Sequence, residues 1–208
     1  MTRPSSPEIR RIIESHLRGA GIHPGTCVRA ACLRAADNTT DDKPAAGDEA
    51  LDWTLSTELP ATVFDWDRYD FVSEVLLADG MRVPASGQVP LLDSHNRQSA
   101  LDVLGHVRDF AEIKAGEYPG RSGQVRFAAD EKSQVVRQKI IDGHITDGSV
   151  GYQVTKSLWI QEGMTIAING RNFTGPLKVS SEWSLKEFSI TPIGADVLAK
   201  VRRLCGGL

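Results

Sequence analysis

The sequence predicts an α+β fold with a mostly antiparallel, β-rich core and a few flanking helices. Three observations support this class: short β-friendly runs separated by Gly, Pro or polar turns, one internal amphipathic segment, and apolar helical stripes near both ends. Apolar residues make up 40% and charged residues 25% of the 208 residues, an ordinary globular composition. The predicted strands are 71–77, 88–92, 101–110, 124–129, 145–154, 158–160 and 177–191.

The chain begins with a predicted helix and a predicted linker. Ser6 suits a helix N-cap, and Ile9 and Ile13 share one face of the segment 6–18 that follows. From 23 to about 51 the sequence is rich in Ala, Asp and Thr and offers little to bury, which indicates a mobile linker. We therefore expect residues 1–51 to form an N-terminal helix and flexible linker, and residues 52–208 to form the folded domain.

Two more helices and a hairpin complete the predicted elements. Asp130 suits an N-cap and Gly143 a C-cap, and the helix between them has an apolar stripe of Val135, Val136, Ile140 and Ile141. Asn169-Gly170 follows an apolar run and predicts a hairpin, because both turn positions need positive φ. A final helix is expected after Pro192, with basic residues in its last turns.

Charge, hydropathy and cysteine content exclude several functions. The 24 Lys+Arg against 27 Asp+Glu give a net charge of −3, which argues against binding nucleic acid through bulk charge. No run approaches the ~18 apolar residues of a membrane span, and no hydrophobic signal region begins the chain, so we expect a cytosolic protein without membrane contact. Three cysteines and no phosphate-binding Gly-rich loop predict neither a disulfide framework nor a cofactor.

Two residues have settings that suit acyl-transfer chemistry. Ser149 lies in a predicted strand with Gly148 and Gly151 close by, so backbone can approach a substrate carbonyl there. The same glycines also fit a bent strand with a purely structural role. His95 stands where a buried apolar strand gives way to a polar turn, a position that suits a general base but also a solvated histidine.

A serine nucleophile with a histidine base needs an acceptor that orients the imidazole. Glu187 is the candidate, and strand alternation predicts Leu185 and Ser189 on its own face. The competing interpretation is a surface carboxylate paired with Lys186 or Lys178.

The histidines also raise a metal-site alternative. His95, His106 and His144 would supply three ligands, but their spacing matches no standard zinc pattern and no H-E-x-x-H helix is present. The expectation is therefore that the chain holds no metal.

A family resemblance rests on four segments in order, 89–95, 104–108, 142–152 and 185–192. In these segments the chain resembles the HK97-type phage prohead proteases, which are serine peptidases related in fold to the herpesvirus assemblins. The resemblance covers about residues 52–201. It implies a herpesvirus-protease-like, β-barrel-like core, a general base at His95 after the "PLL" strand, and a nucleophile at Ser149 in "SVGY". By resemblance the third catalytic residue is Glu187, with His106 as the alternative.

The resemblance implies a serine endopeptidase of bacteriophage or prophage capsid maturation. It would act inside the immature capsid in the bacterial host cytoplasm, on scaffold and on N-terminal segments of the capsid protein. Self-cleavage within the linker and a homo-oligomeric state are further expectations. Two alternatives remain: a catalytically silent capsid-assembly or scaffold module of the same fold, and a histidine-based metallohydrolase.

Overall fold

The computed structural model describes residues 27–33 and 50–193. The predicted helix over 6–18 and the predicted final helix lie outside these residues. The described strands are β1 (Cys27–Leu33), β2 (Leu51–Thr57), β3 (Ala61–Asp65), β4 (Asp70–Leu76), β5 (Met81–Arg82), β6 (Gln88–Asp93), β7 (Val103–Ala115), β8 (Tyr118–Phe127), β9 (Asp147–Ile160), β10 (Thr165–Ile168), β11 (Arg171–Thr174) and β12 (Leu177–Thr191). The helical segments are η1 (Ala78–Gly80), η2 (Ala100–Asp102) and α2 (Glu131–Ile141).

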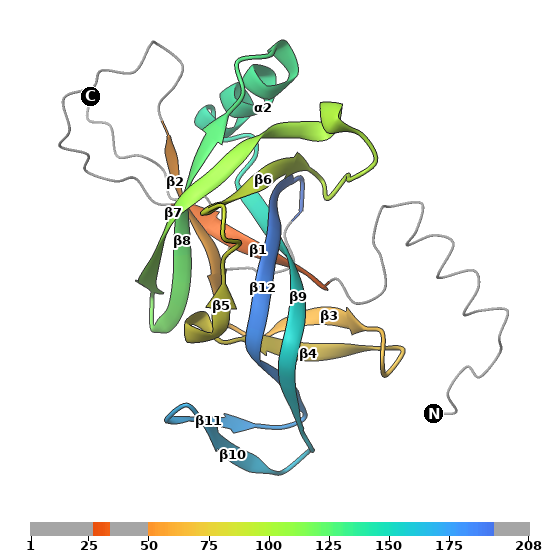
Figure 1. Cartoon of the computed structure of the whole chain (residues 1–208). Coiled ribbons are helices and arrows are strands. Elements are labelled where there is room, and N and C mark those ends of the chain that lie inside the picture. The colour runs from red at the N-terminus through yellow and green to blue at the C-terminus, as the bar shows by residue number, and fades with distance from the viewer. Residues whose placement is uncertain (1–26, 34–49, 194–208) are drawn as a thin grey trace, which may run out of the picture.

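One large sheet dominates the described part of the chain. Its strand order is β3-β4-β12-β6-β7-β8-β2-β1-β9, and β9 pairs a second time with β12. The sheet therefore closes on itself into a ring of β12, β6, β7, β8, β2, β1 and β9, while β3, β4 and β5 extend from β12 outside the ring. Figure 1 shows the long strands β9 and β12 side by side through the molecule, with the β10–β11 hairpin beyond one end.

The predicted α+β class with flanking helices is wrong, and the core is a mixed sheet, although most of its strand pairs are antiparallel. The described residues are mostly strand, α2 is the one α-helix among them, and the sheet is mixed, because β12 runs parallel to β4, β5 and β6. The chain between β6 and β12 is long enough to make such a crossover. Packing between segments distant in sequence decides which strands become neighbours in the sheet. Local sequence patterns therefore do not predict the strand order.

Strand β1 lies inside the segment predicted to be a linker. It pairs with β2 through Cys32 and Leu33, and with β9 through residues 27–31, so it supplies the link that closes the ring. The run Cys-Val-Arg-Ala-Ala-Cys-Leu is short and contains alanines, which are weak strand formers. Its strand pattern is therefore too weak to be recognised within a polar segment. The division into residues 1–51 and 52–208 stays a prediction.

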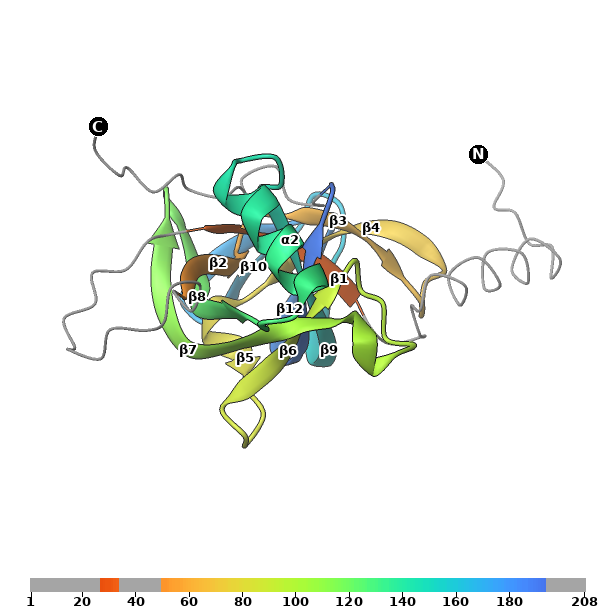
Figure 2. The same ribbon diagram turned by 90° about the horizontal axis from the view of Figure 1, so that it is seen from above.

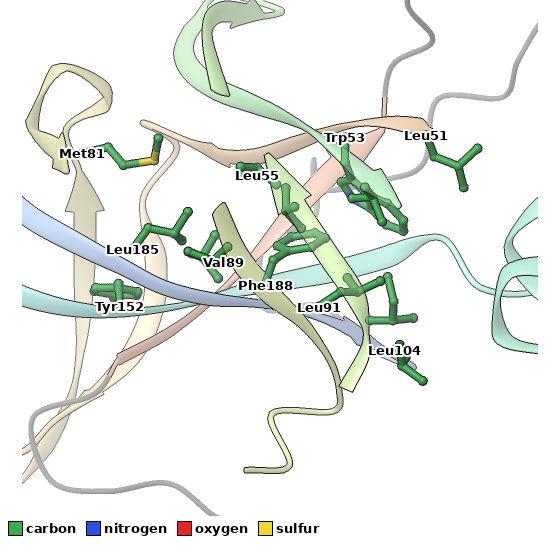
Figure 3. Packing of buried hydrophobic residues seen from close by; sticks show 14 of the residues in the cluster. Leu51, Trp53, Leu55, Met81, Val89, Leu91, Leu104, Tyr152, Leu185 and Phe188 are labelled. Atoms are coloured by element: carbon green, nitrogen blue, oxygen red, sulfur yellow. The ribbon is translucent and has the colours of Figure 1, made fainter. Parts of the chain in front are cut away.

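The hydrophobic core fills the interior of the ring. Trp53, Trp183, Tyr152 and Phe188 are its largest buried side chains, and the rings of Trp53 and Phe188 meet edge to face with centroids 5.4 Å apart. Figure 3 shows core side chains from several strands converging between the sheet walls. Because the interior is apolar, polar residues that alternate with core residues along β9 and β12 lie on the outer face.

The internal helix and the hairpin form where the sequence predicts them. Asp130 caps α2 by accepting a 3.1 Å hydrogen bond from the backbone N–H of Ser133, and Gly143 follows the helix with φ 77°. Ile140 is buried, whereas Val135 and Ile141 are exposed, so the apolar stripe is narrower than predicted. Asn169 and Gly170 have φ 49° and 76° between β10 and β11. In Figure 2, α2 lies across one end of the ring.

Candidate active site

The outer face of the β9–β12 pair places two of the predicted site residues together. Ser149 of β9 is directly opposite Ser189 of β12, and Gly151 is opposite Glu187. Val150 and Tyr152 of β9 and Phe188 of β12 point into the core, so the residues that alternate with them face outward. Directly opposed side chains in a sheet have Cβ atoms about 4.5–5.5 Å apart, and Ser149 therefore lies close to Ser189.

A β-bulge next to Glu187 corrects the predicted alternation along β12. Three residues, 185–187, face only Tyr152 and Gly151 on β9, so one residue is extra. Leu185 consequently joins the core, while Glu187 faces outward with Ser189, and the prediction that Leu185 shares its face is wrong. The surface-carboxylate interpretation of Glu187 is also wrong, because Glu187 is only 2% exposed and Lys178 pairs with Asp65.

A strained turn brings His95 over this face. β6 pairs in parallel with β12 up to Asp93, and the backbone N–H of Asn96 then donates to the carbonyl of Asp93 at 2.8 Å. Ser94 and His95, the two central residues, have φ 49° and 61°, as in the primed turns that normally use Asn or Gly. Such positive-φ residues cost about 1–3 kcal/mol and concentrate at functional sites, where the surrounding structure imposes them.

Hydrogen bonds fix the imidazole and the carboxylate in one network. Nδ1 of His95 lies 2.7 Å from Oε1 of Glu187. Ser189 donates its hydroxyl to Oε2 of Glu187 at 2.8 Å and accepts the backbone N–H of His95 at 3.1 Å. Nη2 of Arg97 donates to Oε1 of Glu187 at 2.9 Å. Burial raises the pKa of Glu187, but the bonds from His95, Arg97 and Ser189 outweigh burial and hold that pKa below its ordinary value.

The second ring nitrogen of His95 is the atom available for chemistry. Because Nδ1 bonds to a carboxylate that keeps its charge, Nδ1 carries the hydrogen and Nε2 of the neutral ring is an acceptor. Nε2 is buried and has no hydrogen-bond partner among the described residues. Ser149, 3% exposed, therefore makes no hydrogen bond to it here; catalytic hydrogen bonds often form fully only when substrate is bound.

Neither the His106 alternative nor the histidine metal site matches this geometry. His106 lies on β7 opposite Pro90, and neither nitrogen of His95 bonds to it, since Nδ1 is taken by Glu187 and Nε2 is unpartnered. Within residues 50–193, no three His, Cys, Asp or Glu side chains are grouped so as to hold a metal ion. The three histidines thus do not converge on a shared ligand position.

The sequence does not predict a role in the site for Arg97 or Ser189, which are both members of the network. Strand alternation predicts only that Ser189 lies on the same face as Glu187. Arg97 follows His95 by two residues, in Ser-His-Asn-Arg, and a cation so close to a candidate base was the available signal. Its carboxylate partner is 90 positions away, and only the fold reveals that contact.

Comparison with known proteins finds no match among models of protein families, curated proteins or solved structures. In the part of the chain that the structure describes, no helix combines the length and apolar character needed to cross a membrane.

Proposed function

We propose that the chain is a serine endopeptidase of phage capsid maturation, of the prohead protease type. The observation that carries the proposal is the 2.7 Å contact between His95 and Glu187, beside Ser149 on the neighbouring strand, with Nε2 of His95 unpartnered. A nucleophile, a base and a carboxylate that orients the base are the three parts of a serine-peptidase site. The motif resemblance supplies the substrate class: scaffold and N-terminal capsid-protein segments, with cleavage of the chain itself.

The proposed reaction is acyl transfer through Ser149. Nε2 of His95 takes the hydroxyl proton while Oγ of Ser149 attacks the peptide carbonyl, and the resulting imidazolium is stabilised by the carboxylate of Glu187. His95 then gives its proton to the leaving amine, and the acyl-enzyme forms. In the second half His95 takes a proton from water as the water oxygen attacks the ester carbonyl. His95 then gives this proton to Oγ of Ser149 as the bond between Oγ and the acyl carbon breaks, which releases the acid and restores both residues. The reaction would take place inside the immature capsid in the host cytoplasm.

Co-expression with the neighbouring scaffold and capsid genes tests this function. Mass spectrometry of the products should show shortened scaffold and capsid protein with the wild-type chain, and intact proteins with Ser149→Ala. Ser157→Ala is the matched control, because Ser157 lies on the same strand but is exposed and far along β9 from the site. Processing that survives Ser149→Ala would overturn the proposal.

The two alternative functions predict different outcomes of co-expression, of labelling by a serine-directed fluorophosphonate and of treatment with a chelator. A silent assembly module would co-assemble with capsid protein but would neither process it nor react with a serine-directed fluorophosphonate. A metallohydrolase would process substrates without Ser149 and would lose activity to a chelator. A serine peptidase requires labelling of Ser149 that His95→Ala abolishes.

A further inference from the structure

Arg97 is a charged member of the site that the mechanism above does not use. Its guanidinium contacts Oε1 of Glu187, the same oxygen that bonds to the imidazole of His95. The side chain of Glu187 is 2% exposed and that of Arg97 26%, so the cation reaches an almost fully buried carboxylate from the solvent side. Nε of Arg97 is itself buried and has no partner among the described residues.

Strand β9 leaves room for this contact because its residue at position 151 is glycine, which has no side chain. A Cβ atom on Gly151 of β9 would come within 2.0 Å of Oε1 of Glu187 and within 2.5 Å of Nη2 of Arg97. Any other residue at position 151 would therefore occupy the place where the two charged groups meet. The glycine that the sequence analysis assigned to backbone approach or strand bending instead accommodates an ion pair on the outer face.

We propose that Arg97 is a positioning residue, which fixes the carboxylate of Glu187 for His95 and places a positive charge on the oxygen that the imidazole shares. The inference rests on the proposed peptidase function. Oε1 has two donors and Oε2 has Ser189, so the carboxylate cannot rotate without breaking charge-assisted hydrogen bonds. The positive charge of Arg97 also opposes formation of the imidazolium on the other side of the same oxygen.

The other charged groups around the turn that carries His95 have partners of their own. Asp93, at the end of β6, pairs with Lys132 of α2 at 3.2 Å. Asp147, at the start of β9, accepts the hydroxyl of Thr146 at 2.8 Å. Among residues 50–193, Glu187 and Arg97 are thus the charged side chains that this hydrogen-bond network joins to the His95 ring, and Arg97 supplies the positive charge. Neutralising Arg97 should therefore change the protonation of His95 in one direction.

The test measures the rate at which an alkyl fluorophosphonate labels Ser149 between about pH 5 and 9 in the full chain. Arg97→Met should lower the limiting rate about tenfold, because the carboxylate is less well positioned. The acid limb, where the labelling rate falls at low pH, should also move to higher pH by about one unit, because the cation beside the imidazole is lost. Arg97→Lys keeps the charge and should leave the acid limb in place. Arg108→Met, at an exposed ion pair on β7, is the control that should match wild type.

A second measurement separates failure of this inference from failure of the proposed function. In the NMR titration of the His95 ring, assigned with His95→Ala, the midpoint should move to higher pH in Arg97→Met and not in Arg97→Lys. If Ser149 is never labelled but the midpoint moves, the peptidase function is wrong and the coupling stands. Unchanged midpoints, or equal losses of rate in both variants without a moved acid limb, would overturn the role of Arg97. Arg97→Gln replaces Arg97→Met in both measurements if circular dichroism shows that variant unfolded.

Discussion

The imidazole of His95 and the carboxylate of Glu187 are in direct contact across 92 positions of sequence, with Nδ1 and Oε1 2.7 Å apart. Both side chains are nearly buried, at 10% and 2% exposure. A buried hydrogen bond of this kind holds the ring in one tautomer and one orientation, with the free nitrogen on the side that faces away from the carboxylate. The contact therefore determines what His95 can do chemically.

Replacing Glu187 with Gln should abolish most of the activity while retaining the shape of the side chain. An amide cannot stabilise the imidazolium and can donate to Nδ1, which would favour the wrong tautomer, so labelling of Ser149 by a fluorophosphonate should slow by about 10⁴-fold. The matched control is Glu182→Gln, a half-exposed carboxylate on the same strand that pairs with Arg82. Equal labelling rates in Glu187→Gln and wild type would remove Glu187 from the mechanism.

Adding a single methyl group at Gly151 should damage the same site from the neighbouring strand. The Cβ of Gly151→Ala would lie 2.0 Å from Oε1 of Glu187, so the carboxylate must move and its bond to His95 must lengthen or break. Overpacking of this kind costs about 1–3 kcal/mol of stability, and the labelling rate should fall by at least tenfold. Chemical denaturation and fluorophosphonate labelling measure the two effects.

A control for Gly151→Ala must lose stability without touching the site. Gly116, in the turn between β7 and β8, has φ 63° and open space around it, so Gly116→Ala introduces backbone strain alone. It should cost about 1 kcal/mol and leave the labelling rate of the folded protein unchanged. If Gly151→Ala behaved in the same way as Gly116→Ala, the close packing of Glu187 against β9 would be contradicted.

The elements that depend on local signals are the ones the sequence predicts well. The cap at Asp130 and the turn at Asn169 need only neighbouring residues, and the structure places both as predicted. The closure of the sheet by β1 and the parallel neighbours of β12 depend on segments far apart in the chain. Periodicity carries no information on such pairings, so the sequence did not predict the mixed sheet.

The candidate site shows the same division between local and distant information. Motif resemblance singles out His95, Glu187 and Ser149, and the structure brings the first two into contact and the third onto the adjacent strand. The bulge that turns Glu187 outward needs one extra residue opposite β9, which strict alternation cannot anticipate. The sequence places Arg97 two residues after His95, but its contact with Glu187 is visible only in the fold.

Acid should weaken the folded state partly through Glu187. Its pKa is lowered on folding from the ordinary value of 4.5, so the ionised carboxylate stabilises the fold fully above that value. This contribution should be lost progressively as the pH falls below 4.5 through the lower pKa of the folded state. Urea unfolding between about pH 3 and 7 should show a shallower acid decline in Glu187→Gln than in wild type. Parallel declines would show that Glu187 is not linked to folding in this way.

Arg171 should hold the β10–β11 hairpin against the rest of the molecule. Its guanidinium contacts Glu58 and donates to both carboxylate oxygens of Asp79 at 2.8 Å, and Glu58 is only 5% exposed. Burial raises the pKa of Glu58 despite these contacts, so removing the cation leaves a costly buried acid. We expect Arg171→Ala to lose about 3 kcal/mol of stability and to speed hydrogen exchange in β10 and β11.

The control is Arg82→Ala: Arg82 pairs with Glu182 at 3.2 Å on the surface, and its loss should cost at most about 0.5 kcal/mol. Equal losses in the two variants would contradict the role of Arg171 in holding the hairpin.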